Sequence, residues 1–237
     1  MTVVSTMRQQ GDADGFASGS AASPEMVFIP LSLTRTGLKG LRSGSQAIPE
    51  RPVRLGDLPL RVAKTADGAY EVIDGFKRLE RWRSAGLSEV PVIPEAVSGL
   101  EQKVALLEAN RPPRTLTPMD EARVVRAIRL EEKLGPKGIA RVLGRKPSWV
   151  TTRLMLAERL SETVVCLVDK GEVGVTLAHA LCALDYTAQE AVCETILRHG
   201  LKGQEALALT SAYRTASHPD ERRALLTDPA AFELYSG

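Results

Sequence analysis

The segment from Gly135 to Leu160 constrains the fold more than any other part of the chain. It reads GPKGIARVLGRKPSWVTTRLMLAERL, in which Ala140 precedes Gly144 by four residues and Val150 follows it by six. A small residue lets two helices approach, a glycine adopts the positive φ of a tight turn, and a branched residue packs the second helix onto the first. This spacing predicts a helix-turn-helix over residues 135–156.

The second helix of this motif has an apolar side, with Val150 and Leu154, and an opposite side rich in hydroxyl groups and cations. In DNA-binding helix-turn-helix proteins, the start of the second helix reaches base edges, while hydroxyls and cations hold phosphate. The residues that we expect at such an interface are Arg145, Lys146, Ser148, Trp149, Thr151, Thr152 and Arg153. Two alternatives remain open: an ordinary helical hairpin, or a Trp149 that packs inside the protein.

The charge along the chain is uneven. Residues 111–159 carry 12 Lys+Arg against 5 Asp+Glu, whereas residues 1–110 carry 13 of each and residues 160–237 carry 6 against 11. A basic middle part between a neutral and an acidic part is typical of a chain in which one module meets phosphate. A solvated basic helix face would give the same counts.

The chain changes character along its length, and we expect an α+β protein with a small mixed α/β domain before an all-α domain. Residues 1–25 are rich in Gly, Ser and Ala without apolar periodicity, which predicts a disordered tail. Residues 26–108 predict the α/β domain, residues 109–199 the helical DNA-binding domain, and residues 200–237 C-terminal helices and a tail. Aromatic residues make up only 4% of the chain, so the cores must be built mainly from aliphatic side chains.

Local patterns place the expected elements within these domains. Apolar β-prone runs predict strands at residues 26–33, 59–65, 69–74 and 90–94, and a helix is expected at 75–85 and at 100–108. Thr117 followed by Pro118 predicts the start of a helix that runs to about Leu134. Its buried side should include Ala122, Val125, Ile128 and Leu130.

The three cysteines are Cys166, Cys182 and Cys193, and their spacing matches neither a metal pair nor a disulfide framework. We expect all three to be small core residues in a cytoplasmic protein. His179 should pack or cap a helix, because no further ligand stands at metal spacing. No apolar run approaches the roughly 20 residues of a membrane helix, so we expect no membrane association.

The order of these features resembles a known family. The blocks YEVIDGFKRLERWRSAGLSEVPVI, LLEANRPPRTLTPMDEA, the helix-turn-helix, and LSETVVCLVDKGEVGVTLAHAL are similar to the ParB/RepB partition family in sequence and order. The resemblance covers residues 26–184. It implies a ParB-like N-terminal domain that in many members binds CTP and closes on DNA, followed by a helical domain that reads a specific site.

The resemblance also implies a set of nucleotide contacts. The family's Gly-Glu-Arg-Arg run aligns with Gly75, Phe76, Lys77 and Arg78, which keeps the glycine and two cations but loses the acidic residue. A second family motif keeps only its asparagine, and Ala109 stands where the family has a hydrolytic glutamate. The implied nucleotide-binding residues are Gly75, Lys77, Arg78, Asn110 and Arg114. A solvated basic face is the alternative for the cations of this helix.

We therefore expect a sequence-specific DNA-binding protein of the ParB type, acting in plasmid or chromosome partition or in mobile-element maintenance. The resemblance implies CTP with Mg²⁺ as a switch, double-stranded DNA, a homodimer and a ParA-type ATPase as partners, and a location on the nucleoid or a plasmid. We identify neither catalytic nor metal-binding residues. The alternatives are a nucleotide-dependent enzyme on the same fold, namely a CTPase, kinase or nuclease, and a transcriptional regulator.

Overall fold

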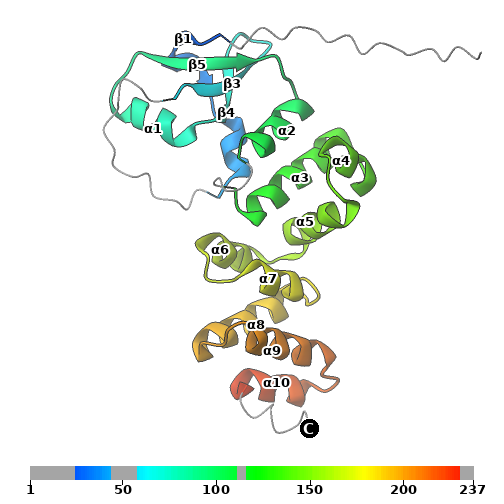
Figure 1. The fold of residues 1–237 in the computed structure, drawn as a ribbon. Helices are drawn as coiled ribbons and strands as arrows, with labels where there is room; N and C mark the ends of the chain where they lie inside the picture. The colour runs from blue at the N-terminus through cyan, green and yellow to red at the C-terminus, as the bar shows by residue number, and fades with distance from the viewer. Residues whose placement is uncertain (1–24, 44–57, 111–115, 230–237) are drawn as a thin grey trace, which may run out of the picture.

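The computed structural model describes residues 25–43, 58–110 and 116–229. The predicted tail, except for Glu25, lies outside the described residues, as does Arg114. A β-sheet with two helices occupies one end of the molecule, the helix-turn-helix lies in the middle, and five helices are stacked toward the other end (Figure 1). This arrangement confirms the predicted α+β class with a helical C-terminal part.

The N-terminal unit is built on a mixed sheet in the order β1-β5-β3-β4-β2. The strands are β1 (Val27–Pro30), β2 (Thr34–Arg35), β3 (Leu60–Lys64), β4 (Tyr70–Asp74) and β5 (Glu89–Glu95). β1 pairs with β5 and β3 with β4 in antiparallel orientation, whereas β3–β5 and β2–β4 are parallel. Short 3₁₀ helices, η1 (Leu31–Leu33) and η2 (Gly37–Leu41), flank β2.

Two helices pack below the sheet in the view of Figure 1. α1 (Phe76–Ser84) buries Phe76, Leu79 and Trp82, which are spaced three apart and therefore share one side of the helix. α2 (Leu100–Ala109) buries Leu106 and Leu107 in the same cluster. Both helices confirm the predicted ranges to within a residue or two.

The predicted strand at residues 26–33 is correct only in its first half. β1 ends at Pro30, and the amide of Leu31 donates to the carbonyl of Ser88, just before β5 begins. The strand therefore has no further partner, and residues 31–33 turn into η1. The two-residue strand β2 and η2 were not predicted, because neither has enough residues to show a period.

α3 (Pro118–Glu132) begins where the sequence predicts. The Thr117 hydroxyl accepts from the Asp120 amide, and the Asp120 carboxylate accepts from the Thr117 amide, which is a capping box. Ala122, Val125 and Ile128 are buried as expected, but Leu130 is 62% exposed. That prediction was wrong, because two residues turn a helix by about 200° and carry Leu130 away from the side of Ile128.

The helices α4 (Pro136–Val142) and α5 (Pro147–Arg159) form the predicted helix-turn-helix. Ile139, Ala140, Val150 and Leu154 are buried together with the side chains of the sheet, α1 and α2. The helix-turn-helix thus shares one hydrophobic cluster with the N-terminal unit. The domain boundaries stay a prediction.

The remaining helices are α6 (Glu162–Lys170), α7 (Val175–Leu181), α8 (Tyr186–His199), α9 (Gln204–Thr215) and α10 (Pro219–Thr227). They surround a second cluster that also contains Met119 and Ala122 of α3 and Leu156 of α5. α3 and α5 therefore contribute to both clusters. None of the described helices combines the length and apolar character that a membrane crossing requires.

Candidate nucleic-acid interface

The turn between α4 and α5 has the geometry that its glycine predicts. Gly144 has φ +58°, its amide donates to the Arg141 carbonyl at 3.3 Å, and the Arg145 amide donates to the Ala140 carbonyl at 2.9 Å. This pair of bonds is a Schellman motif, which closes a helix C-terminus around a left-handed residue. The turn leaves Arg145 and Lys146 immediately before α5.

The N-terminus of α5 has no side-chain cap. The side chain of Lys146, the N-cap residue, has no acceptor atom, Pro147 at the first helical position has no amide proton, and the Trp149 amide donates to the Lys146 carbonyl at 3.0 Å. The Ser148 amide and the helix dipole make such a terminus attractive to an anion, and the Lys146 side chain adds a positive charge beside it. The start of α5 is thus suited to a phosphate group.

Three of the predicted DNA-contacting residues are exposed, namely Lys146, Ser148 and Thr151. The Thr151 hydroxyl donates to the Pro147 carbonyl at 3.0 Å, and the partly exposed Thr152 donates to the Ser148 carbonyl at 3.0 Å. Both hydroxyl protons are therefore held within the helix, and the oxygen lone pairs remain available as acceptors.

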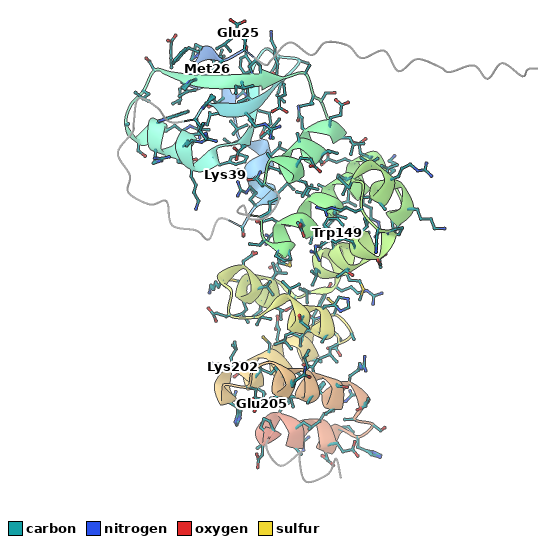
Figure 2. The ribbon with its side chains drawn as sticks, viewed as in Figure 1. Glu25, Met26, Lys39, Trp149, Lys202 and Glu205 are labelled. Atoms are coloured by element: carbon teal, nitrogen blue, oxygen red, sulfur yellow. The ribbon has the colours of Figure 1, made fainter. Side chains whose placement is uncertain are left out.

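The structure favours the alternative in which Trp149 packs within the protein, whereas the expected exposure of Arg153 is wrong. Trp149 is half-buried and packs against the first cluster, and it lies within the helix-turn-helix, far from α9 (Figure 2). The side chain of Arg153 is only 16% exposed and forms an ion pair with Glu121 of α3 at 2.6 Å. Arg153 points toward α3 because α3 and α5 pack closely, which a local sequence pattern does not show.

Two further exposed cations lie on α4, the first helix of the motif, and were not among the predicted contacts. Lys137 and Arg141 are exposed on α4, one helical turn apart. Within the described parts of the chain, none of Lys137, Arg141, Arg145 and Lys146 forms an ion pair with a carboxylate. Their i,i+4 spacing before the turn could have identified the pair on α4.

The predicted nucleotide-binding loop lies at the start of α1. Gly75 is the N-cap of this helix, with φ +102° and no side-chain cap. A Cβ atom at this position would lie 2.6 Å from Cδ2 of Leu60 and 2.9 Å from Nη2 of Arg78, so only glycine fits. The backbone here is compatible with a bound phosphate.

Of the other predicted nucleotide contacts, Arg78 and Asn110 are engaged inside the protein, and Arg114 lies outside the described residues. Arg78 forms an ion pair with Asp74 at 3.0 Å and donates to the carbonyls of Leu58 and Pro59. Asn110 is buried and donates to the Leu106 carbonyl at 2.8 Å. Lys77 is partly exposed on the first turn of α1. The loop therefore fits a phosphate at its backbone better than at its predicted side chains.

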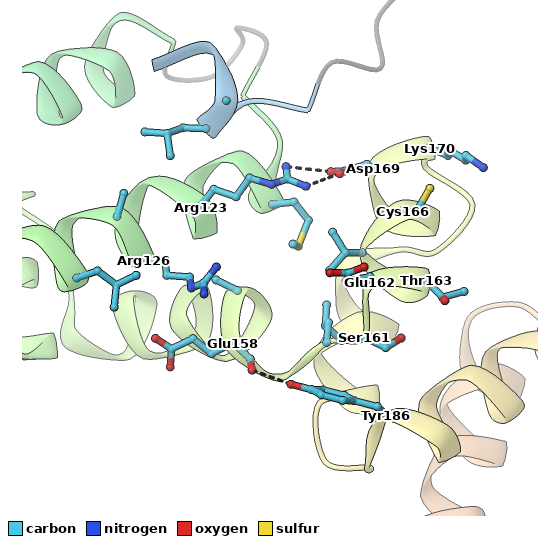
Figure 3. Close-up of a pocket in the computed structure, with 18 of the residues that line it drawn as sticks. Arg123, Arg126, Glu158, Ser161, Glu162, Thr163, Cys166, Asp169, Lys170 and Tyr186 are labelled. Carbon is cyan, nitrogen blue, oxygen red and sulfur yellow. Dashed lines mark hydrogen bonds and ion pairs between the residues drawn. The ribbon is translucent and has the colours of Figure 1, made fainter. Parts of the chain in front are cut away.

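A cleft of about 1380 Å³ opens between α3 and α6 (Figure 3). Arg123 bridges it by an ion pair with Asp169, and the Tyr186 hydroxyl donates to the Glu158 carbonyl. Its charged lining residues are Arg123, Arg126, Lys170, Glu131, Glu158, Glu162, Asp169 and Glu190, an excess of acidic groups. That balance disfavours nucleic acid here and leaves the helix-turn-helix as the candidate interface.

The predictions for cysteine and histidine are partly wrong. Cys182 and Cys193 are buried as expected, but Cys166 is exposed in the cleft. Burial raises the pKa of Cys182 to about 11 and also raises the pKa of Cys193. His179 is exposed on the last turn of α7 instead of packed. Among the described residues no group of three His, Cys, Asp or Glu could hold a metal ion.

The chain is similar in sequence to a family model and to known proteins. Residues 114–214 match the family model described as the ParB HTH domain. The chain is 30% identical over 190 residues to the probable chromosome 1-partitioning protein ParB of Deinococcus radiodurans, covering 80% of this chain and 61% of that protein. It is 32% identical over 176 residues to the chromosome-partitioning protein Spo0J of Thermus thermophilus, covering 74% and 63%.

The chain thus spans a little over three fifths of the length of these relatives. Among solved structures, it is similar to C-terminally truncated ParB of Caulobacter crescentus complexed to the centromeric parS site, with 22% identity, a TM-score of 0.44, and coverage of 78% of this chain and 98% of that one. The matched family model includes the helix-turn-helix and the helices around it. By this model and these two relatives, the chain is similar to proteins of the ParB family.

Proposed function

We propose that this chain is a sequence-specific DNA-binding protein of the ParB type that acts in chromosome or plasmid partition. One observation carries the proposal: four exposed or partly exposed cations on α4 and in the turn before α5 have no carboxylate partner among the described residues, and α5 begins without a side-chain cap. The relatives named for chromosome partitioning support it, and one solved family member is described as a complex with parS DNA.

In the proposed complex α5 enters the major groove and α4 lies across the backbone. Ser148, Thr151 and Arg145 lie near the end of α5 that would meet base edges, while Lys146, Lys137 and Arg141 would hold phosphate. A homodimer on a two-fold site and a ParA-type ATPase partner belong to the same proposal. Analytical ultracentrifugation of the protein with and without its DNA site would measure the stoichiometry.

The test is a selection of bound duplexes from a random library, followed by affinity measurements at several salt concentrations. We expect an enriched site, and a slope of log K against log salt that Lys146→Ala reduces by about 0.9, the value for one lost phosphate contact. Lys202→Ala is the matched control, because Lys202 is an exposed lysine near the distal helices (Figure 2). Absence of an enriched site, or an equal effect of the two variants, would contradict the proposal.

A second candidate function is a CTP switch, favoured by the glycine at the start of α1 that leaves no room for a Cβ atom. We propose that CTP, with its Mg²⁺, places a phosphate on the backbone at Gly75 and beside Lys77. One solved relative is described as a complex with CTP-γ-S. Ala109 has no group that could orient a water, so we expect binding without rapid hydrolysis.

Calorimetric titration of the protein with CTP, with and without Mg²⁺ and the enriched duplex, tests this candidate. We expect CTP to bind with higher affinity than ATP and Lys77→Ala to weaken CTP binding, whereas Lys64→Ala, which removes an exposed lysine from the end of β3, should not. Equal binding of both nucleotides, or no heat with either, would reject the switch. The DNA-binding proposal would stand unaffected.

A further inference from the structure

Arg153 is held by α3 in a way that removes it from the DNA-facing surface. Its Nε and Nη2 atoms lie 2.7 Å and 2.6 Å from the same Oε2 atom of Glu121, and both side chains are 16% exposed. Separating such a mostly buried pair leaves a poorly solvated carboxylate behind, which is unfavourable. Arg153 therefore stays with Glu121.

The Trp149 ring joins this pair to the turn. The guanidinium carbon of Arg153 lies 5.0 Å from the centroid of the ring, and that of Arg145 lies 5.2 Å from it. Both distances are within the range of cation–π attraction. Trp149 and Arg153 are one helical turn apart on α5, whereas Arg145 comes from the turn before the helix. One aromatic ring thus holds two guanidinium groups.

The two cations differ in what neutralises them. Glu121 compensates Arg153, while Arg145 has no carboxylate partner among the described residues. Two uncompensated guanidinium groups on one ring would repel each other, so the charge of Glu121 also stabilises the position of Arg145. Arg145, Trp149 and Glu121 line one small hollow together with Glu108, so these side chains lie near one another.

We propose that Glu121, Arg153 and Trp149 are positioning residues that orient Arg145 for DNA. The proposal rests on the DNA-binding function proposed above. A free arginine side chain loses much rotational freedom when it binds, and a platform that already restricts it reduces that loss. Arg145 is then the arginine of this group that touches DNA, and Trp149 and Arg153 act through it.

One substitution, Glu121→Gln, should change the DNA affinity in opposite directions under this proposal and under a simple charge effect. Removing a carboxylate from a DNA-binding surface should strengthen DNA binding by charge alone. We expect Glu121→Gln to weaken binding to the most enriched duplex by about 5-fold, the size of a modest cation–π or ion-pair contribution. Glu132→Gln is the matched control on α3, since Glu132 is exposed and forms no ion pair among the described residues. It should leave binding unchanged or slightly stronger.

A double-mutant cycle tests whether the effect passes through Arg145. Trp149→Leu should weaken binding by about 5-fold in the wild-type background, and Trp149→Phe, which keeps an aromatic face, by less. In the Arg145→Ala background, Trp149→Leu and Glu121→Gln should each change the affinity by less than about 2-fold. Circular dichroism at the assay temperature establishes that each variant is folded, and only folded variants enter the cycle.

Several outcomes would overturn the inference. If Trp149→Leu reduces the DNA affinity of the Arg145→Ala variant as much as it reduces that of the wild-type protein, Trp149 touches DNA itself or acts only on folding. Stronger binding by Glu121→Gln would show that its charge, and not its position, matters. If the wild-type protein enriches no duplex, the function itself fails, and this result is distinct from additive losses in a protein that binds.

Discussion

Gly138 and Gly144 stand six residues apart in the helix-turn-helix and have different backbone conformations, right-handed helical at Gly138 and left-handed at Gly144. Gly144 has φ +58° and open space around its Cα, whereas Gly138 lies inside α4 with helical geometry and only ordinary contacts to Leu134. The cost of a side chain at Gly144 is thus purely conformational. At Gly138 a side chain would reduce the freedom of the unfolded chain without strain.

We predict that the same substitution has opposite signs at these two positions. Gly144→Ala should lower the free energy of unfolding by about 1 kcal/mol, the cost of a left-handed alanine. Gly138→Ala should raise it by about 0.5 kcal/mol, the gain from replacing glycine within a helix. Urea denaturation followed by circular dichroism measures both. A change of the same sign at the two positions would show that the turn does not have this conformation.

At the scale of elements, α3 connects the parts of the molecule. It packs on α2 and α5, its Met119 and Ala122 belong to the second cluster, and its Arg123 pairs with Asp169 of α6. Buried Lys103 of α2 reaches Glu131 of α3 at 2.5 Å. α3 therefore contacts a helix of the sheet unit, the second helix of the helix-turn-helix and the first of the distal helices.

We predict that the capping box at this start contributes to stability. Thr117→Ala removes the hydroxyl that accepts from the Asp120 amide, and should lower the free energy of unfolding by about 1 kcal/mol. Thr187→Ala, an exposed threonine in the first turn of α8 whose helix is capped by Asp185, should change it by less than about 0.5 kcal/mol. Chemical denaturation of both variants gives the comparison. Equal losses would mean that the cap contributes nothing specific.

At the scale of the whole molecule, two hydrophobic clusters share α3 and α5. Val150 and Leu154 of α5 belong to the first, and Leu156 of the same helix belongs to the second. If either cluster were disrupted, apolar side chains of α3 and α5 would be exposed, and these two helices also contribute to the other cluster. The reactivity of the three cysteines can be used to follow the packing of the second cluster, since Cys182 and Cys193 belong to it and Cys166 lies outside it.

We predict that one thiol reacts in the native protein and that the other two react only on opening. At pH 8 a thiol reagent should label Cys166 quickly, and Cys166→Ser should abolish this fast phase. Cys182 and Cys193 should remain unlabelled, because burial both shields them and raises their pKa, to about 11 for Cys182. Mass spectrometry of the labelled protein gives the sites. Rapid labelling of Cys182 in the folded protein would contradict the packing of α7.

The raised pKa of Cys182 also has a consequence for stability. Below the ordinary pKa of 9.0 the thiol is protonated in both the folded and the unfolded chain, so its contribution to the free energy of unfolding is fully present. As the pH rises from about 9 toward about 11, only the unfolded chain loses the proton, and folding becomes less favourable. Denaturation at pH 8 and pH 10 should show a smaller loss of stability for Cys182→Ala than for the wild-type protein.

The sequence by itself determined the features that depend on near neighbours. The start of α3 at Thr117 and Pro118, the left-handed turn at Gly144, and the buried positions Val150 and Leu154 all follow from residues within a few positions of each other. Backbone conformation and helical period act over that range. The basic interface could therefore be predicted as a region, from its turn and its charge.

Only the tertiary structure decided which cations remain available to a ligand. Arg153 is paired with Glu121, which stands 32 residues earlier, and Arg78 donates to the carbonyl of Leu58, 20 residues earlier. Cys166 is exposed although its neighbours in the sequence are apolar. These outcomes depend on which elements pack against each other, and an ion pair between distant elements leaves no periodic signal in the sequence. The place of Glu121 beside Arg145 and Trp149 was settled in the same way, by the packing of α3 against α5.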